Sequence, residues 1–200
     1  RNKDMHETQL LLENNKYTSI KHFPNWLSYQ EANDLLTTSI EKVPWRQDFI
    51  YMMGKKIPIP RLQNWYCEIG ASYTYSRIKL LALEFPSWMV DLMRKVELST
   101  SETFNAILVN YYRDGKDSND WHSDDEKELG AYPVIASVSI GAERVFHLRH
   151  KVTKQKIKMN LPHGSLLLMG AGIQEYWQHK LSKTSLQVGP RINLTLRYMT

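Results

Sequence analysis

The chain has 200 residues, of which 42% are apolar, enough for one compact domain and too few for two independent cores. Its only cysteine is Cys67, which excludes an intrachain disulfide and a thiolate metal cluster, so a metal would need His, Asp or Glu ligands. The formal net charge of +5 favours anionic partners, but an excess this small is weak evidence. The sequence has neither an apolar run of membrane-helix length nor a signal-peptide pattern at its amino end, so we expect a soluble intracellular protein.

The amino-terminal segment 1–16 is polar, and we predict that it is frayed. Residues 17–200 contain no repeat, low-complexity tract or Gly/Ser linker. They are therefore predicted to form a single domain.

Two helices are predicted in the first half of the chain. Ser28 and Glu31 have the spacing of a capping box, which favours a helix from about residue 29 to 41. A second helix is predicted over 87–96. Its apolar face would consist of Met89, Leu92, Met93 and Val96, at spacings typical of core-facing residues.

Between these helices lies an apolar tip followed by glycine and two lysines, the segment 51–56. Such a pattern predicts a turn between two short strands. Two interpretations remain open: the methionines Met52 and Met53 pack inward, or they are exposed for a function.

The second half of the chain changes to β patterning. Short segments rich in Val, Ile, Leu, Tyr and Thr are separated by glycine, proline and aspartate. The predicted strands are 104–113, 134–141, 144–151, 155–161, 165–170 and 191–199. Six short strands after two helices predict an α+β, mainly β fold: an antiparallel jelly-roll core supported by amino-terminal helices.

Positive charge is concentrated in segment 149–158, which carries six Lys, Arg or His residues and is predicted to be a hairpin. A solvated hairpin and an edge that contacts phosphates fit this pattern equally well.

The strongest chemical signal is a possible metal site. His122 and Asp124 are separated by one residue, so in an extended chain both side chains lie on the same face. His179 follows an apolar strand, and a neighbouring strand of a jelly roll could bring it beside them. Two imidazoles and one carboxylate leave three positions open on an octahedral ion, which is typical of non-haem iron(II) oxygenases. Zinc is more usually held by four ligands.

The predicted last strand could anchor an acidic co-substrate. It places Arg191, Asn193, Thr195 and Arg197 on one face. An ordinary half-exposed strand would alternate in the same way, but two arginines on the side shared with a metal site favour carboxylate binding.

These residues belong to a wider pattern that resembles the AlkB-type nucleic-acid demethylases, in the subgroup that includes the human DNA-repair homologues. The resemblance covers some two thirds of the chain. It runs through 60–63, 73–76, 110–112, 122–126, 135–139, 163–166 and 190–197.

The resemblance implies an Fe(II)- and 2-oxoglutarate-dependent dioxygenase, with a jelly-roll core over about 104–200 and a nucleotide-recognition lid over about 45–80. Its iron ligands would be His122, Asp124 and His179. Arg191 would pair with the distal carboxylate of 2-oxoglutarate, and Arg197 would lie nearer the iron. Further co-substrate contacts would come from Asn110, Tyr112, Asn193 and Thr195. The implied reaction uses O2 to hydroxylate an N-methyl group, which leaves as formaldehyde, with succinate and CO2 as the other products.

The resemblance also implies substrate contacts. A flipped base would lie against His122 and an aromatic residue of the lid, for which Tyr75 is the best match and Tyr73 and Trp65 are further candidates. Burial in the core is the alternative for each aromatic, and for Trp65 it is at least as well supported. Glu126 would face the cationic ring of N1-methyladenine or N3-methylcytosine, with surface solvation as its alternative.

Arg61 falls within the resemblance and is a further candidate contact. Segment 51–56 resembles the wedge hairpin of duplex-acting relatives, in which Met53 would fill the gap left by a flipped base and Lys55 would meet a phosphate.

We therefore predict a monomeric enzyme that repairs N-alkylated bases in DNA, in the bacterial cytoplasm or, for a eukaryotic chain, in the nucleus. The alternatives are the same chemistry on methylated RNA or a protein side chain, a non-catalytic nucleic-acid-binding module, and a zinc hydrolase.

Overall fold

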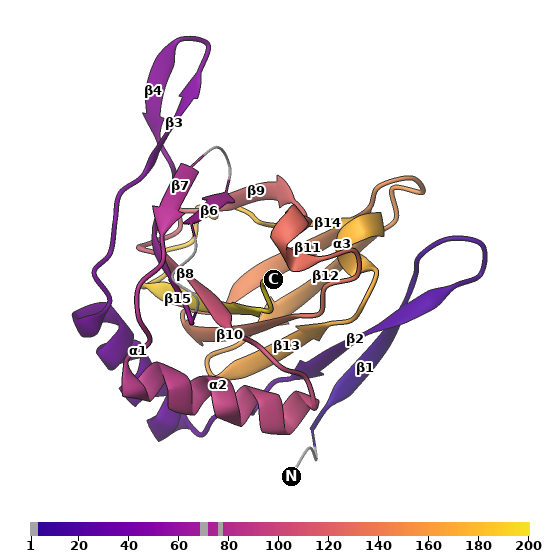
Figure 1. Cartoon of the computed structure of the whole chain (residues 1–200), viewed down its shortest axis with the longest axis horizontal. Coiled ribbons are helices and arrows are strands. Elements are labelled where there is room, and N and C mark those ends of the chain that lie inside the picture. The colour runs from indigo at the N-terminus through magenta and orange to yellow at the C-terminus, as the bar shows by residue number, and fades with distance from the viewer. Residues whose placement is uncertain (1–3, 69–71, 76–77) are drawn as a thin grey trace.

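The computed structural model describes residues 4–68, 72–75 and 78–200, and side chains from 69 to 80 lie outside this description. Its centre is a pair of antiparallel sheets that face each other (Figure 1). The larger sheet has the strand order β1-β2-β13-β10-β15-β8-β5, and the smaller sheet has the order β12-β11-β14-β9. This arrangement confirms the predicted mainly β, jelly-roll core.

The larger sheet consists of β1 (His6–Leu11), β2 (Tyr17–Phe23), β5 (Leu62–Cys67), β8 (Ala106–Tyr112), β10 (Ile135–Gly141), β13 (Ser165–Met169) and β15 (Arg191–Arg197). The smaller sheet consists of β9 (Asn119–His122), β11 (Arg144–His150), β12 (Lys156–Leu161) and β14 (Trp177–Leu181). The six predicted strands are confirmed to within two residues at each end. The basic segment 149–158 lies in the β11–β12 hairpin, as predicted.

Two helices pack on the outer face of the larger sheet (Figure 1). The first is α1 (Tyr29–Lys42), whose capping box is present in both directions between Ser28 and Glu31. The second is α2 (Ser87–Thr100), which is a turn longer than predicted. Its Met89, Leu92, Met93 and Val96 are buried, as expected for the core-facing stripe.

The two faces of strand β15 in the larger sheet carry different side chains, apolar on one face and polar on the other. On β15, the apolar residues Ile192 and Leu194 belong to the core beneath the helices. The intervening polar residues of β15 point into the space between the two sheets, and they are buried as well. The half-exposed strand considered as an alternative is therefore excluded, because both faces of β15 are covered. A buried row of polar side chains needs partners inside the barrel.

The prediction that residues 1–16 are frayed is wrong for residues 6–11. Strand β1 pairs with β2 along its whole length, from His6 opposite His22 to Leu11 opposite Tyr17. Leu10 is fully buried in the core between the sheets. The sequence did not reveal this strand because a single buried side chain in a polar segment does not produce a visible alternation.

A hairpin formed by β3 (Phe49–Met52) and β4 (Lys55–Pro58) projects away from both sheets (Figure 1). Its turn is the residue pair Met53 and Gly54, both with positive φ, as a two-residue hairpin turn requires. Met52 is exposed and Met53 is 99% exposed, so the interpretation that the methionines pack inward is wrong.

The remaining elements are the strands β6 (Ser72–Tyr75) and β7 (Ile78–Leu81), the short helix α3 (Ile173–Tyr176) and a 3-10 turn at Lys127–Leu129. Strands β6 and β7 pair with each other. None of the helices in the described ranges combines the length and apolarity that crossing a membrane requires.

Candidate active site

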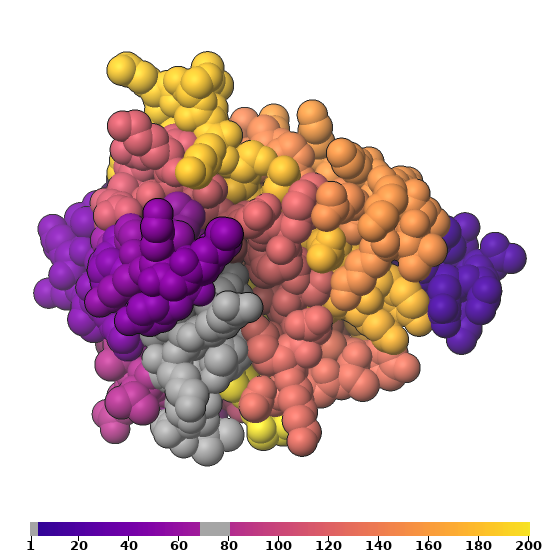
Figure 2. Space-filling model, turned by 90° about the horizontal axis from the view of Figure 1, so that it is seen from above, coloured from indigo at the N-terminus to yellow at the C-terminus, as the bar shows by residue number. Residues whose placement is uncertain are grey.

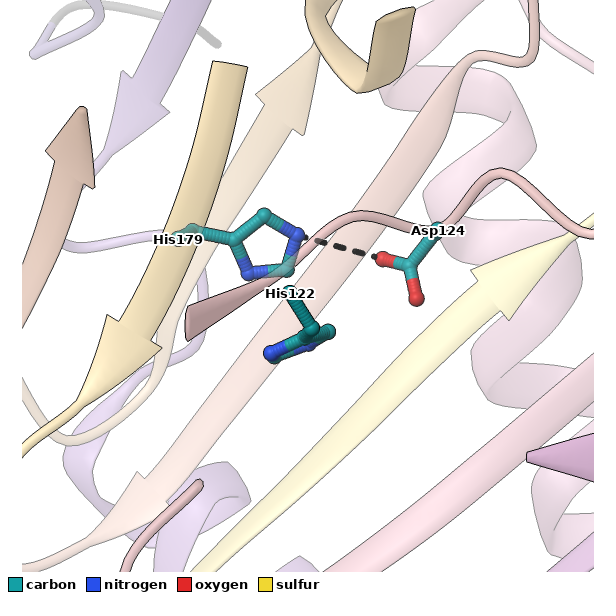
Figure 3. A group of neighbouring side chains, drawn as sticks. All are labelled: His122, Asp124 and His179. Atoms are coloured by element: carbon teal, nitrogen blue, oxygen red, sulfur yellow. Dashed lines mark ion pairs between the residues drawn. The ribbon is translucent and has the colours of Figure 1, made fainter. Parts of the chain in front are cut away.

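Three potential metal ligands meet at one edge of the smaller sheet. His122 is the last residue of β9 and lies directly opposite His179 of the neighbouring strand β14. Asp124 follows two residues after His122, where the chain leaves the strand. One ligand atom from each residue can be chosen so that all three lie within 4.8 Å of one another. Figure 3 shows the side chains of His179 and Asp124 directed toward each other, with His122 beside them.

Asp124 is buried and held between two basic groups. Its Oδ1 accepts a hydrogen bond from Nη2 of Arg197, and its Oδ2 lies 3.4 Å from Nε2 of His179. Burial alone would raise the pKa of the Asp124 carboxyl, but the charge of Arg197 and a hydrogen bond with His179 hold this pKa well below its usual range. Asp124 is therefore ionised at neutral pH and can bind a cation.

His122 is suited to metal binding through Nε2. Its Nδ1 lies 2.7 Å from the carbonyl oxygen of Asp120, so Nδ1 carries the proton and donates a hydrogen bond to this oxygen. Burial and the neighbouring His179 lower the pKa of His122 to about 3. The imidazole is therefore neutral, with its lone pair on Nε2.

Gln174 connects two of these ligands, and the sequence analysis did not identify it. It lies in α3 and is only 1% exposed. Its Oε1 accepts a hydrogen bond of 2.9 Å from the backbone N–H of Asp124 and lies 3.2 Å from Nε2 of His179. No spacing pattern marks this residue, because its role depends on the turn that brings α3 against the 122–124 segment.

The cavity beside the three ligands is lined by the polar face of β15. Register pairs Arg191 with Tyr112 of β8 and Asn193 with Asn110 of the same strand. The predicted co-substrate residues Asn110, Tyr112, Arg191, Asn193, Thr195 and Arg197 all line this cavity, together with His122, Asp124 and His179. The structure therefore brings the two predicted sets together.

Arg191 is a buried cation of this cavity. It is 2% exposed, donates one hydrogen bond of 2.9 Å from Nη2 to Oγ of Ser139, and lies with Cζ 5.2 Å from the ring centre of Tyr112. In the part of the chain that the structure describes, no carboxylate pairs with it, and its Nε has no hydrogen-bond partner. Burial lowers the pKa of Arg191 to about 10, so it remains charged. A buried, unpaired guanidinium is costly unless a ligand supplies the anion.

The side-chain amide groups near Arg191 are also arranged for a ligand. Asn193 Nδ2 donates to Oγ of Ser137, and its Oδ1 accepts from Oγ1 of Thr195. By contrast, Oδ1 of Asn110 is buried with no hydrogen-bond partner among the described residues. The Nε–H of Arg191 is therefore a buried donor in this cavity that fits a ligand carboxylate, whereas Oδ1 of Asn110, an acceptor, would need a donor.

The donor set and the unpaired arginine agree with the comparison to known proteins. The sequence profile of the 2OG-Fe(II) oxygenase superfamily matches residues 19–197. The chain belongs to this superfamily. Its residues fit the Fe(II) and 2-oxoglutarate after which the superfamily is named: two imidazoles and a carboxylate for the iron, and a buried guanidinium for a dicarboxylate.

The resemblance to AlkB-type proteins is confirmed by individual relatives. Alpha-ketoglutarate-dependent dioxygenase alkB homolog 3 of Mus musculus is 41% identical over 187 residues, which are 88% of this chain and 64% of the relative. DNA oxidative demethylase ALKBH2 of Homo sapiens is 36% identical over 156 residues, which are 74% of this chain and 60% of the relative. The chain thus spans less than two thirds of the length of these curated relatives.

The fold also resembles solved structures at low sequence identity. The structure of OsALKBH1 matches with a TM-score of 0.63 at 15% identity, over 89% of this chain and 97% of that chain. An oxidoreductase of the 2OG-Fe(II) oxygenase family from Burkholderia pseudomallei matches with a TM-score of 0.61 at 11% identity, over 90% of this chain and 84% of that chain. These likenesses concern the fold alone.

A larger cleft of about 490 Å³ adjoins the buried cavity. The two spaces share the wall formed by Asn119, His122, Lys180 and Leu181. Arg61 and Trp121 also line the cleft, and Arg61 donates a hydrogen bond of 3.1 Å from Nη1 to the carbonyl oxygen of Ser118. Figure 2 shows this end of the molecule, with the β3–β4 hairpin in purple and the segment around residue 120 in salmon.

The predicted substrate contacts have different outcomes. Trp65 is 2% exposed and packs in the core, so the prediction that it contacts a base is wrong and its alternative holds. Glu126 is half-buried at the start of the 3-10 turn. Met53 and Lys55 lie at the exposed tip of the β3–β4 hairpin. The side chains of Tyr73 and Tyr75 lie outside the described residues.

Proposed function

We propose that this chain is an oxidative demethylase of N1-methyladenine and N3-methylcytosine in DNA. The observation that carries the proposal is the pair of adjoining spaces that share His122: a buried cavity with an unpaired arginine, and a wide cleft open to a large substrate. The names of the relatives, among them DNA oxidative demethylase ALKBH2, favour the same reaction.

In this proposal His122, Asp124 and His179 hold the iron, and Arg191 binds the distal carboxylate of 2-oxoglutarate with Asn110, Tyr112, Asn193 and Thr195 around it. Iron, 2-oxoglutarate and O2 together supply an oxidant for the N-methyl group, which is hydroxylated and released as formaldehyde, with succinate and CO2 as co-products. Arg197 keeps Asp124 ionised through its hydrogen bond to Oδ1. The protein's task is to orient the methyl group and to keep competing chemistry out.

The basic outer face of the smaller sheet favours a nucleic-acid substrate. At the rim of the cleft, the guanidinium of Arg149 lies 4.2 Å from the ring centre of Trp121, and the ammonium of Lys180 lies 4.8 Å from the same ring. Strand pairing places Lys156 beside Arg149, and Lys158 beside His147. Such a cluster of cations around a half-buried indole suits phosphates and stacked bases.

The lesion itself explains a role for Glu126. N1-methyladenine and N3-methylcytosine are cationic, so a carboxylate in a confined pocket would favour them over neutral bases. We propose that Glu126 supplies this charge, that Arg61 contacts the substrate in the cleft, and that Tyr75, with Tyr73 as a further candidate, contacts the flipped base.

The β3–β4 hairpin suits a duplex substrate. Met52 and Met53 are exposed at its tip, and Lys56 lies 4.4 Å above the ring of Phe49 at its base. An apolar tip can fill the gap that a flipped base leaves in a stack, while Lys55 contacts phosphate. Replacing Met52 and Met53 with serine should therefore reduce demethylation of double-stranded DNA more than that of single-stranded DNA. An equal loss on both substrates would contradict this role.

The proposed function is tested with oligonucleotides that carry N1-methyladenine, as single-stranded DNA, double-stranded DNA and matched RNA. The protein is incubated with Fe(II), ascorbate and 2-oxoglutarate in air, and methyl loss is followed by mass spectrometry. Methyl loss should require 2-oxoglutarate and vanish in the His122→Ala variant. If 2-oxoglutarate is converted to succinate but no oligonucleotide is demethylated, the substrate is wrong. If neither reaction occurs with iron bound, the demethylase proposal fails.

A further inference from the structure

Two loops meet on a single buried guanidinium at the end of the barrel where Arg191 lies. Arg144 is the first residue of β11 and is 4% exposed. It donates hydrogen bonds to three backbone carbonyl oxygens: from Nη1 to Asp114 at 3.2 Å, and from Nη2 to Asp117 at 2.9 Å and Ser182 at 2.7 Å. One side chain therefore fixes two loops and the start of its own strand.

Each of the two loops joins a strand of the co-substrate cavity to a strand with a metal ligand. Segment 113–118 leads from β8, with Asn110 and Tyr112, to β9, with His122. Segment 182–190 leads from β14, with His179, to β15, which begins at Arg191. A shift of either loop would therefore move residues on both sides of the site.

The backbone at this end of the barrel is packed too closely for ordinary side chains. A Cβ atom at Gly115 would lie 2.5 Å from the carbonyl oxygen of Thr184. One at Gly141, where φ is +92°, would lie 2.2 Å from the carbonyl oxygen of Pro190, the residue before Arg191. These contacts close the barrel behind Arg191, and the bonds of Arg144 hold them together.

Arg144 also contributes charge to the cavity. Its Cζ lies 6.0 Å from the ring centre of Tyr112, and Cζ of Arg191 lies 5.2 Å from the same ring. Neither guanidinium forms an ion pair with a carboxylate in the described ranges. The Asp117 carboxylate, which is near Arg144, is occupied by two hydrogen bonds from the side chain of Arg113. After burial, the charge of Arg144 is a further cause of the lowered pKa of Arg191.

Two buried cations around one phenol ring repel each other, and an anion bound at Arg191 relieves this repulsion. The relief is available only to a ligand whose far end is charged, because the keto-acid end is directed to the metal. The charge of Arg144 therefore favours the binding of a dicarboxylate over the binding of a monocarboxylate.

We propose that Arg144 is a positioning and specificity-determining residue for 2-oxoglutarate. Without touching the co-substrate, it fixes the two loops that set Arg191 and Tyr112, and its charge favours a keto acid with a second carboxylate. The proposal rests on the role of Arg191 proposed above and is independent of which nucleic acid the enzyme repairs.

The test compares the binding of 2-oxoglutarate with that of 2-oxopentanoate, in which a methyl group replaces the distal carboxylate. Binding to the Mn(II)-loaded, full-length chain is measured by calorimetry, so no turnover is needed. In Arg144→Gln, the preference for 2-oxoglutarate should fall on the order of tenfold, as expected for a lost charge at this range in a protein interior. Lys116→Gln, which removes an exposed cation from the same loop and leaves the pair of Arg113 and Asp117 intact, should leave the preference unchanged.

Two further variants separate the possible failures. In Arg191→Met the preference for 2-oxoglutarate should be lost, and if it persists, the anchor role of Arg191 is wrong. If the preference is lost in Arg191→Met but unchanged in Arg144→Gln, only the role of Arg144 is overturned. Should Arg144→Gln fail to fold, the Arg144→Lys variant tests the positioning role of Arg144 instead. Lysine keeps the charge but cannot reach three carbonyls, so both ligands should bind more weakly with the preference retained. An unchanged affinity for both ligands in Arg144→Lys overturns the positioning role.

Discussion

Replacing Gln174 with leucine tests whether a buried side chain outside the metal-binding triad holds two of its members in place. Leucine fills a similar volume but removes the oxygen that accepts the backbone N–H of Asp124 at 2.9 Å and lies 3.2 Å from Nε2 of His179. The N–H of Asp124 would be left buried without this partner. An unsatisfied buried donor costs about 1–3 kcal/mol.

Part of that cost would appear as weaker metal binding, because Asp124 and His179 would no longer be held at a fixed distance. Loss of a partner that orients a metal ligand typically lowers metal affinity about 10- to 100-fold. We therefore expect Gln174→Leu to bind Mn(II) or Co(II) at least tenfold more weakly in calorimetric titrations of the metal-free protein. The melting temperature of the metal-free variant should also fall.

Gln178 provides a matched control. It lies next to His179 on β14, but its side chain accepts a hydrogen bond from Arg149 on the outer face of the sheet. Gln178→Leu should leave metal affinity within about twofold of the wild type, since it removes only a partly exposed interaction. An undiminished metal affinity in Gln174→Leu would refute the reasoning.

Three other predictions concern separate parts of the molecule. Arg191→Gln should raise the KM for 2-oxoglutarate at least about tenfold while the folded fraction stays unchanged, because the charge-assisted hydrogen bonds to the distal carboxylate are lost; steady-state kinetics with circular dichroism would check this. Trp65→Ala should lower the free energy of unfolding by about 3–5 kcal/mol in urea titrations, as for a large core side chain, whereas a normal stability with an altered base preference would restore its role as a substrate contact. Glu31→Gln should destabilise the protein by about 0.5 kcal/mol at pH 7, because it removes the ion pair with Lys95 and leaves a neutral capping hydrogen bond to Ser28 in place of a charge-assisted one. The hydrogen bonds with Lys95 and Ser28 lower the pKa of Glu31 to about 2. The extra stability of the wild type over Glu31→Gln is therefore complete above the ordinary pKa of 4.5 and should disappear as pH falls from 4.5 toward 2. A stability difference that does not change with pH across this window would contradict this role of the Glu31 charge.

The sequence by itself determined the elements whose signals are local. The capping box at Ser28 and Glu31 sets the start of α1, and the alternation from Arg191 to Arg197 defines β15 and its polar face. The one-residue spacing of His122 and Asp124 indicated a metal site, because an extended chain places both on one side. Agreement of short motifs in order along the chain then indicated the family.

The tertiary structure decided everything that depends on which segments meet. His179 lies beside the other two potential ligands because β14 pairs with β9. Gln174 holds the backbone of Asp124 because α3 packs against that segment. Neither contact can be predicted from the spacing of these residues along the chain. The same holds for Trp65, whose aromatic ring is equally consistent with a base contact or a core position until the packing between the sheets is known. Arg144 is the clearest case, since its three carbonyl partners are 27 to 38 residues away in the sequence and come together only when the barrel closes.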